Sequence, residues 1–355
     1  MSLTVLTQAP IATRVDFDAY PSAIAGLSAK PGAPGGSGAP AKPGGSAGPG
    51  GSRLFRYTPQ GDVIRPPYPF QGRIAAGGDF PPAFQRYVLY VSYACPWAQR
   101  QLIVRELKGL QAAIPVAVVD PVRDGRGWAF REGPDLTLDH FNGFTFLREA
   151  YEATSPGYPG HISVPVLWDT VSQRIVSNNF PDISLDLGGQ FNAWADNPDL
   201  DLYPQELRPE IDALNAKVYD TVNNGVYKAG GARNQGAYDR AIAALFATLD
   251  ELEERLAGRT HLFGDRLTEA DIRLWVTLAR FDAVYVTHFR TNLRRLVDYP
   301  NLWDYARFLY RIPAFSETTK FDHIKRHYYI THDHLNPHRI VPIGLIADWD
   351  APTQR

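Results

Sequence analysis

Cys95 is the residue best suited to covalent chemistry, and it is the only cysteine among the 355 residues. Residues 87–92 before it (Tyr-Val-Leu-Tyr-Val-Ser) are rich in β-branched and aromatic side chains and predict a strand. Pro96 suits the first position of a helix, and side chains recur after it at helical spacing. Free backbone N–H groups and the helix dipole favour a thiolate at such a junction. Free cysteine is often buried and structural, but the strand–Cys-Pro–helix arrangement favours a reactive thiol.

The elements expected around this cysteine follow the order β-α-β-α-β-β, which is the thioredoxin-like pattern. A second strand is predicted at residues 114–119, a second helix at 142–153, and a hairpin at 164–176. Pro165 lies inside a predicted strand, where proline removes a ladder donor. Either the Val164–Pro165 bond is cis and leaves the Val164 backbone free for a ligand, or Pro165 marks an edge strand.

The chain before this unit has a different composition. Residues 26–52 are almost entirely Gly, Pro, Ala, Ser and Lys without a collagen period, so the extension 1–52 is predicted to be a disordered tether. Residues 53–83 are rich in Pro, Gly and aromatic side chains and are expected to wrap a folded surface as loops. We assign residues 84–192 to the thioredoxin-like domain.

The remaining chain is predicted to be all-helical over residues 205–340, after a polar linker, with a C-terminal tail at 341–355. One helix start is especially clear, since Thr268 and Asp271 form a capping box. Further helices are expected at 206–223, 238–256 and 300–311, and residues after Pro313 are expected to form a tail rich in His and Tyr.

Composition limits the possible functions. The chain is 44% hydrophobic and carries a net charge of −2, which indicates a sizeable core and favours neither nucleic acid nor an anionic membrane as a partner. We see neither a bilayer-spanning apolar run nor a signal peptide, and we expect a cytoplasmic location. A lone cysteine excludes an internal disulfide, so any second thiol must come from another molecule.

Five segments resemble the signature strings of the Xi-class glutathione transferases, the glutathionyl-hydroquinone reductases: residues 92–98, 127–128, 164–169, 218–230 and 321–329. The resemblance covers about residues 61–342. It implies the glutathione transferase fold, in which an α/β thioredoxin-like N-terminal domain precedes an all-α C-terminal domain. It also implies a homodimer with no tightly bound cofactor.

The resemblance further implies a reaction. In that family a cysteine attacks the glutathione sulfur of a glutathionyl-hydroquinone, the hydroquinone leaves, and a second glutathione resolves the mixed disulfide. The partners are thus a small-molecule thiol and a quinone or hydroquinone conjugate. The matching residues here are the nucleophile Cys95, the thiol-binding Trp128, Val164 and Pro165, and the hydroquinone-pocket residues Tyr227 and Tyr328. A phenol O–H can assist a departing aryl oxygen, although core packing alone would also explain each tyrosine.

The chain departs from the family where the γ-glutamyl end of glutathione is held. Asn179 and Phe180 stand where Glu and Ser are expected, so a charge and a hydroxyl are both absent. A charged ligand end left without its partner costs about 2–5 kcal/mol. Asp182 could compensate only if the backbone shifts. Gln99 also replaces a histidine, and the family string near residues 69–71 is altered.

We therefore predict that the co-substrate is a cysteine-bearing thiol without a γ-glutamyl group, such as mycothiol. The alternative is family drift, with glutathione still bound through Trp128 and neighbouring basic residues.

Two other classes of function are compatible with the same sequence. A glutaredoxin-like thiol transferase would use Cys95, and a non-catalytic scaffold would keep only the fold. Histidines 323 and 327 share a helix face, and His332 and His334 follow, but no carboxylate is placed between the first two as a base. We expect no metal site there.

Overall fold

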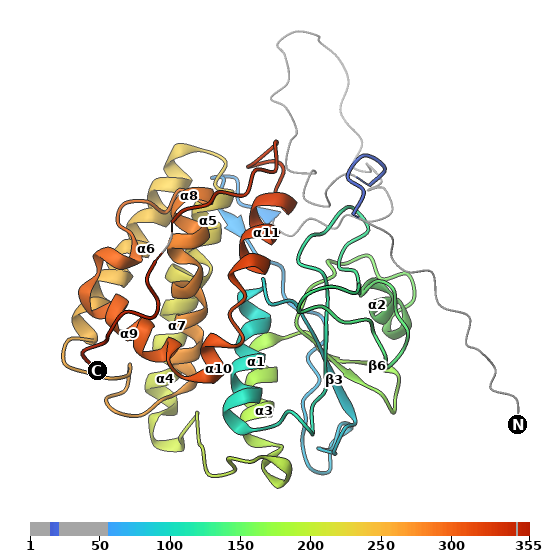
Figure 1. The fold of residues 1–355 in the computed structure, drawn as a ribbon. Coiled ribbons are helices and arrows are strands. Elements are labelled where there is room, and N and C mark those ends of the chain that lie inside the picture. The colour runs from blue at the N-terminus through green and yellow to red at the C-terminus, as the bar shows by residue number, and fades with distance from the viewer. Residues whose placement is uncertain (1–14, 21–55, 346) are drawn as a thin grey trace, which may run out of the picture.

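The computed structural model describes residues 15–20, 56–345 and 347–355, so the predicted tether at 26–52 lies outside the described residues. A unit built on a mixed sheet packs beside a larger helical unit (Figure 1). The wrapping segment contributes only the short strands β1 (Arg56–Tyr57) and β2 (Val63–Ile64), which pair with each other.

The sheet of the first unit has the order β4-β3-β5-β6. Its strands are β3 (Tyr87–Val91), β4 (Val116–Val118), β5 (Val166–Asp169) and β6 (Arg174–Ser177). β3 runs parallel to β4 and antiparallel to β5, which forms the predicted hairpin with β6. All five residues of β3 are buried, as expected for a central strand without charged side chains.

Three helices accompany the sheet: α1 (Pro96–Lys108), α2 (Arg148–Thr154) and α3 (Phe180–Gly189). α1 and α3 lie between the sheet and the helical unit, and α2 lies on the other side of the sheet (Figure 1). The predicted helix at 142–153 is wrong in its first half. The Asp139 carboxylate accepts hydrogen bonds from the N–H groups of Phe141 and Phe144, which holds this stretch in a turn.

The second unit is helical, as predicted. Its α-helices are α4 (Arg208–Val218), α5 (Gly225–Gly231), α6 (Gln235–Arg255), α7 (Glu269–Arg280), α8 (Val286–His288), α9 (Pro300–Tyr310), α10 (Pro313–Ser316) and α11 (Phe321–Thr331). The capping box of α7 is confirmed, because the Asp271 carboxylate accepts a hydrogen bond from the Thr268 N–H at 2.8 Å. Five-residue π-type segments, Tyr219–Asn223 and Phe281–Tyr285, follow α4 and α7.

The residues after Pro313 are not a simple tail, which corrects the sequence prediction. They form α10 and the eleven-residue α11, whose Ile324 and Tyr328 are buried. Because His and Tyr occupy several buried positions of α11, the spacing of apolar residues alone does not predict this helix. α11 lies where the helical unit meets loops of the sheet unit (Figure 1).

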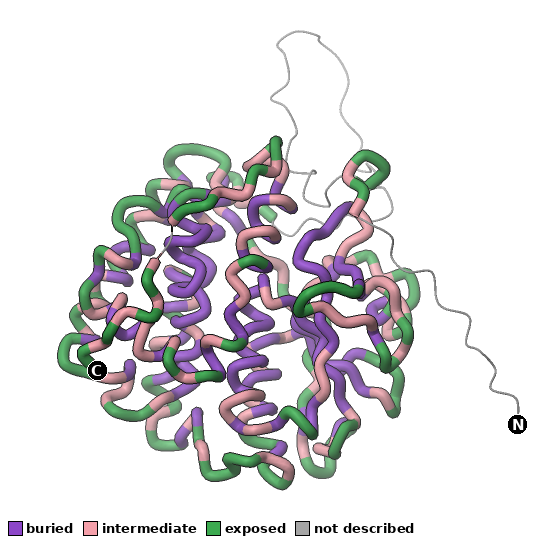
Figure 2. Tube along the Cα trace, viewed as in Figure 1, coloured by how far each residue is buried: buried purple, intermediate pink, exposed green. Residues whose placement is uncertain are grey.

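Burial is densest where the two units meet. Figure 2 shows buried residues concentrated in the sheet, α1 and α7. α1 buries polar side chains as well as apolar ones, including Gln99, Arg100 and Gln101. Each of these side chains makes at least one hydrogen bond to another segment: the Arg100 guanidinium, for example, donates to Asn223 Oδ1 at 2.8 Å. α1 is thus enclosed on both sides, with Cys95 at its N-terminal end.

Candidate active site around Cys95

Cys95 caps α1 in an extended conformation, directly after the loop that follows β3. Its Sγ lies 3.5 Å from the carbonyl oxygen of Val164, which is 69 residues away in the chain. The Val164–Pro165 bond is cis and precedes β5, an inner strand, so the edge-strand alternative is wrong. The structure therefore brings together the predicted nucleophile and the predicted backbone of the thiol site.

The expectation of a thiolate-favouring environment is only half right. The N–H groups of Ala98 and Trp97 and the Arg280 guanidinium lower the pKa of Cys95, but burial raises it more, and the pKa lies above its ordinary value of 9.0. The side chain is only 9% exposed. The cost of desolvating the charged thiolate outweighs the stabilisation that the N–H groups in the first turn of α1 provide. The local sequence does not reveal how deeply Cys95 is buried.

Arg280 at the end of α7 holds the loop before Cys95. Its guanidinium donates to the carbonyl oxygens of Tyr93 at 2.9 Å and Ala94 at 3.1 Å, and to Gln99 Oε1 at 2.6 Å. Gln99 in turn donates to Thr319 Oγ1 at 2.8 Å. The glutamine noted as a departure from the family thus links α1 to the helical unit. Sequence reasoning missed Arg280, because nothing near it in the chain indicates this distant contact.

The predicted tyrosines meet at their hydroxyl groups. Tyr227 Oη on α5 lies 2.6 Å from Tyr328 Oη on α11, and Tyr285 Oη lies 3.1 Å from Tyr328 Oη. Burial raises the pKa of Tyr227 and of Tyr328 well above 10.0, so both keep their protons at neutral pH. The ring of Trp97, two residues after Cys95, stacks on Tyr227 at 6.1 Å. Tyr285 was not predicted, since it sits among apolar residues like an ordinary core side chain.

Trp128 is buried beside α11 rather than on an open surface. Its ring stacks on the His327 ring at 5.2 Å, and the Arg123 guanidinium lies 4.3 Å from its centroid. Trp128 Nε1 is buried and has no hydrogen-bond partner among the described residues. The predicted thiol-binding tryptophan therefore has an unused donor.

Asn179 and Phe180 lie at the N-terminus of α3, and neither offers what a γ-glutamyl group needs. Asn179 Nδ2 donates to Asp182 Oδ2 at 2.7 Å, and Asp182 also lies 3.5 Å from Arg73. Phe180 is 1% exposed and stacks on Trp97 with ring centroids 4.6 Å apart. Tyr68 packs edge-on against Phe180 at 5.3 Å. Aromatic rings therefore surround position 180. The Asp182 carboxylate, which could have replaced the missing glutamate, is already bound to Asn179 and Arg73.

Three histidines in and just after α11 are hydrogen-bonded either to a backbone carbonyl oxygen or to a histidine of α8. His323 Nε2 lies 3.1 Å from the Pro134 carbonyl oxygen, and His327 Nδ1 lies 2.6 Å from that of Pro121. His332 Nδ1 lies 3.1 Å from His288 Nε2. Within residues 15–20, 56–345 and 347–355, no group of three potential ligands is arranged to hold a metal ion.

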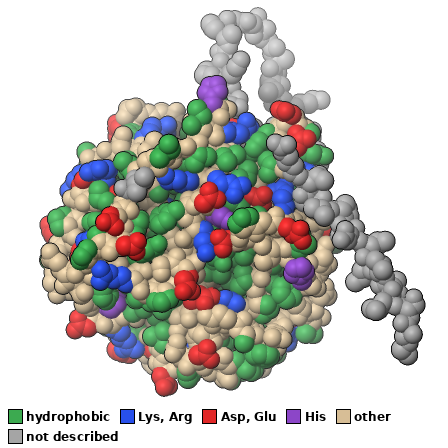
Figure 3. Space-filling view, viewed as in Figure 1, with side chains coloured by type: hydrophobic (Ala, Val, Ile, Leu, Met, Phe, Trp, Pro, Cys, Tyr) green, Lys and Arg blue, Asp and Glu red, His purple; other side chains and the backbone are tan. Residues whose placement is uncertain are grey.

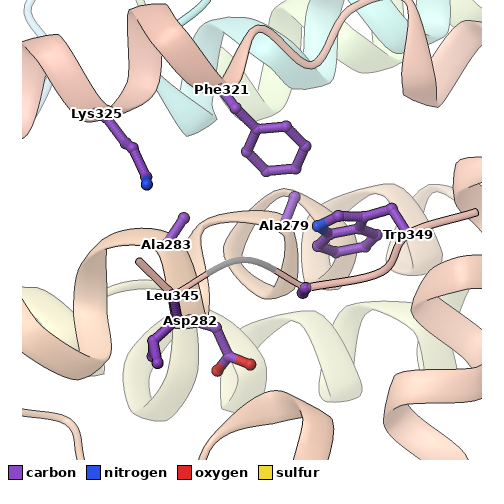
Figure 4. A pocket seen from close by; sticks show the side chains of 8 residues that line it. Ala279, Asp282, Ala283, Phe321, Lys325, Leu345 and Trp349 are labelled. Atoms are coloured by element: carbon purple, nitrogen blue, oxygen red, sulfur yellow. The ribbon is translucent and has the colours of Figure 1, made fainter. Parts of the chain in front are cut away.

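A pocket away from Cys95 lies between α7, the segment after it, α11 and the C-terminal segment (Figure 4). Its lining is mostly apolar, from residues such as Phe321 and Trp349. Its polar groups are engaged: Lys325 Nζ donates to the Ile343 carbonyl oxygen at 2.7 Å, and Asp282 accepts from the Leu296 N–H at 2.6 Å. It contains none of the predicted site residues.

Acidic and basic side chains are interspersed on the face shown in Figure 3, so neither positive nor negative charge predominates there. Among the described helices, none combines the length and the apolar character needed to cross a bilayer.

A thioredoxin-like sheet unit with a cysteine at the start of its first helix, joined to a helical unit, defines the glutathione transferase fold. Residues 235–307 match the family model "Glutathione S-transferase, C-terminal domain". The chain is 46% identical over 284 residues to glutathionyl-hydroquinone reductase PcpF of Sphingobium chlorophenolicum, covering 80% of this chain and 90% of PcpF.

Solved structures agree. The glutathione-S-transferase Xi from Phanerochaete chrysosporium is 49% identical with a TM-score of 0.80, covering 82% of this chain and 95% of its own. Glutathione-bound YqjG from Escherichia coli K-12 is 44% identical with a TM-score of 0.77, and the match covers 85% of this chain and 95% of the YqjG chain. The chain belongs to the Xi class of glutathione transferases, the family of the glutathionyl-hydroquinone reductases, which confirms the resemblance and the fold class.

Proposed function

We propose that this protein is a thiol-dependent reductase that removes a low-molecular-weight thiol from a thiol-conjugated hydroquinone through a mixed disulfide on Cys95. The observation that carries the proposal is the position of Cys95 Sγ, at the start of α1 and 3.5 Å from the Val164 carbonyl oxygen. The naming of PcpF and YqjG as glutathionyl-hydroquinone reductases supports the reaction class.

The reaction proceeds by two sulfur exchanges. The sulfur-bearing ring carbon of the conjugate first takes up a proton, and the neighbouring phenol becomes a ketone. The Cys95 thiolate then attacks the sulfur, the sulfur–carbon electron pair forms a ring double bond, and the ketone oxygen becomes a phenolate that takes up a proton. Tyr227 and Tyr328 are both protonated and hydrogen-bonded to each other, so one hydroxyl donates toward the aryl oxygen as negative charge develops on it and the other donates to that hydroxyl. A second thiol then attacks the mixed disulfide, releasing Cys95 and a symmetric disulfide. The net change is conjugate plus thiol to hydroquinone plus disulfide.

The thiol that fits this site best lacks a γ-glutamyl group. The buried ring of Phe180 offers no partner for an ammonium and carboxylate pair, and Asp182 is occupied by Asn179 and Arg73. Mycothiol carries an acetyl group on its cysteine nitrogen, which is small, uncharged and compatible with an aromatic wall. We therefore infer that mycothiol is the co-substrate. Homodimer formation and a cytoplasmic location stay predictions.

Turnover of two matched conjugates tests this proposal. The kcat/KM of the protein is measured with the glutathionyl and the mycothiyl conjugate of one hydroquinone, each with its own thiol. A loss of 2–5 kcal/mol at the γ-glutamyl end corresponds to a preference of about 30-fold or more for the mycothiyl conjugate. Cys95→Ser is the control and should abolish both activities. Equal or faster turnover of the glutathionyl conjugate would refute the thiol assignment, and no turnover of either would refute the reductase.

A further inference from the structure

Arg123 is a buried cation that the proposed reaction has not used. It lies in the loop between β4 and α2 and is only 6% exposed. Its guanidinium rests 4.3 Å from the centroid of the Trp128 ring. Its Nε is buried without a hydrogen-bond partner, and within the described part of the chain no carboxylate forms an ion pair with it. A buried charge without a partner is costly unless a ligand supplies one.

The neighbouring acidic residues are bound to other arginines. Asp120 lies 2.7 Å from Arg131, and Asp124 lies 2.6 Å from Arg126. His327 stacks on the same Trp128 ring, but burial lowers its pKa to about 3, so it is neutral at pH 7. Burial lowers the pKa of Arg123 only to about 10, which leaves the guanidinium charged. The positive charge beside Trp128 is therefore not compensated locally.

Arg123 is also connected to the tyrosine hydroxyl groups through packed rings. Its guanidinium lies over Trp128, the Trp128 ring stacks on His327, and the His327 ring lies 5.2 Å from that of Tyr328. The unused Trp128 Nε1 adds a second buried donor in the same place. A guanidinium over an indole ring whose N–H is unused suits a carboxylate, which accepts several hydrogen bonds and prefers charged donors.

We propose that Arg123, assisted by the Trp128 indole N–H, is a specificity-determining residue that binds a carboxylate of one of the two small-molecule substrates. The inference rests on the proposed function, because it places that substrate beside Cys95. The carboxylate has two possible sources: a substituent on the hydroquinone, or the glycine end of a glutathione-like thiol. Mycothiol has no carboxylate, so with this thiol the hydroquinone is the source.

The test compares each acid with its ester. On the hydroquinone side, kcat/KM is measured for thiol conjugates of a carboxylated hydroquinone and of its methyl ester. On the thiol side, glutathione is compared with its glycine monoethyl ester as the resolving thiol. Charged hydrogen bonds of this kind correspond to an acid-over-ester preference of about 10- to 100-fold. We expect this preference on one side only, and Arg123→Met should reduce it to about one.

Control measurements separate the inference from the reductase proposal. Arg123→Lys keeps the charge without the planar fork and should retain an intermediate preference. Calorimetry of the free carboxylated hydroquinone, its ester, glutathione and glutathione monoethyl ester with Cys95→Ser protein measures the same acid preference without any turnover. No acid preference in wild-type turnover and in calorimetry would overturn the inference, even if the reductase reaction proceeds. An equal loss on acid and ester in Arg123→Met, with a shifted pH profile of Cys95 alkylation, would also overturn it, because Arg123 would then act on the thiolate.

Discussion

The double substitution Asn179→Glu with Phe180→Ser should convert the site toward glutathione. It restores a carboxylate for the γ-glutamyl ammonium and a hydroxyl for the γ-glutamyl carboxylate at the start of α3. Hydrogen bonds to charged groups contribute about 1.5–3 kcal/mol each. Asp182 lies within hydrogen-bonding distance of residue 179 and would repel a glutamate there, so we take the lower value for both bonds. The expected gain in the binding free energy of the glutathionyl group is then about 3 kcal/mol.

The same change removes a well-packed ring. Phe180 stacks on Trp97 at 4.6 Å and meets Tyr68 at 5.3 Å, and truncating a buried phenylalanine costs about 3–5 kcal/mol of folding stability. Urea unfolding should show this loss in the double variant and equally in Phe180→Ala. The two effects are therefore separable, because Phe180→Ala loses stability without gaining a hydroxyl.

The assay is steady-state kcat/KM with a glutathionyl-hydroquinone and glutathione. A gain of about 3 kcal/mol corresponds to roughly 100-fold over wild type. Asn179→Gln, which adds length without charge, should give no such gain. A folded double variant with wild-type activity toward glutathione would refute the reasoning that this position decides the thiol.

Three further outcomes follow from the site. Alkylation of Cys95 by iodoacetamide should be slow at pH 7 and rise only above pH 9, because burial raises its pKa; a midpoint near pH 6 would contradict this. Tyr328→Phe should lower kcat by about 10- to 100-fold, and more for hydroquinones that are poor leaving groups, since Tyr328 is hydrogen-bonded to Tyr227; wild-type kcat with a poor leaving group would contradict this. Gln99→Ala should cost about 1–3 kcal/mol in urea unfolding by leaving Arg280 with one buried donor unpaired, and an unchanged midpoint would contradict this.

The parts of the site that depend on local sequence could be predicted. The junction at Cys95 follows from a strand, a Cys-Pro pair and a helix that are continuous in the chain. The loss of the γ-glutamyl partners follows from the side-chain types at 179 and 180. The approach of Val164 to Cys95 could be expected only from the recognised fold. The sequence of a single strand does not show which residues of a partner strand lie beside it.

The parts that depend on distant packing could not be predicted. Arg280 and Tyr285 reach the site from the second unit, and their neighbours in sequence read as ordinary helix. The raised pKa of Cys95 reflects burial by segments far along the chain, which the favourable helix terminus does not offset. In the sequence, Arg123 is one of several charged residues in a loop, and its isolation from carboxylates is visible only in three dimensions.

The mixed disulfide on Cys95 is the central claim, and intact-protein mass spectrometry measures it most directly. The protein is incubated with oxidised mycothiol or oxidised glutathione, and any adduct must be on Cys95 because the chain has no other thiol. We predict an adduct with mycothiol that is released by added mycothiol, little adduct with glutathione, and none in Cys95→Ser. An adduct formed readily with glutathione and not with mycothiol would contradict the thiol assignment, and the absence of any adduct would contradict the role of Cys95.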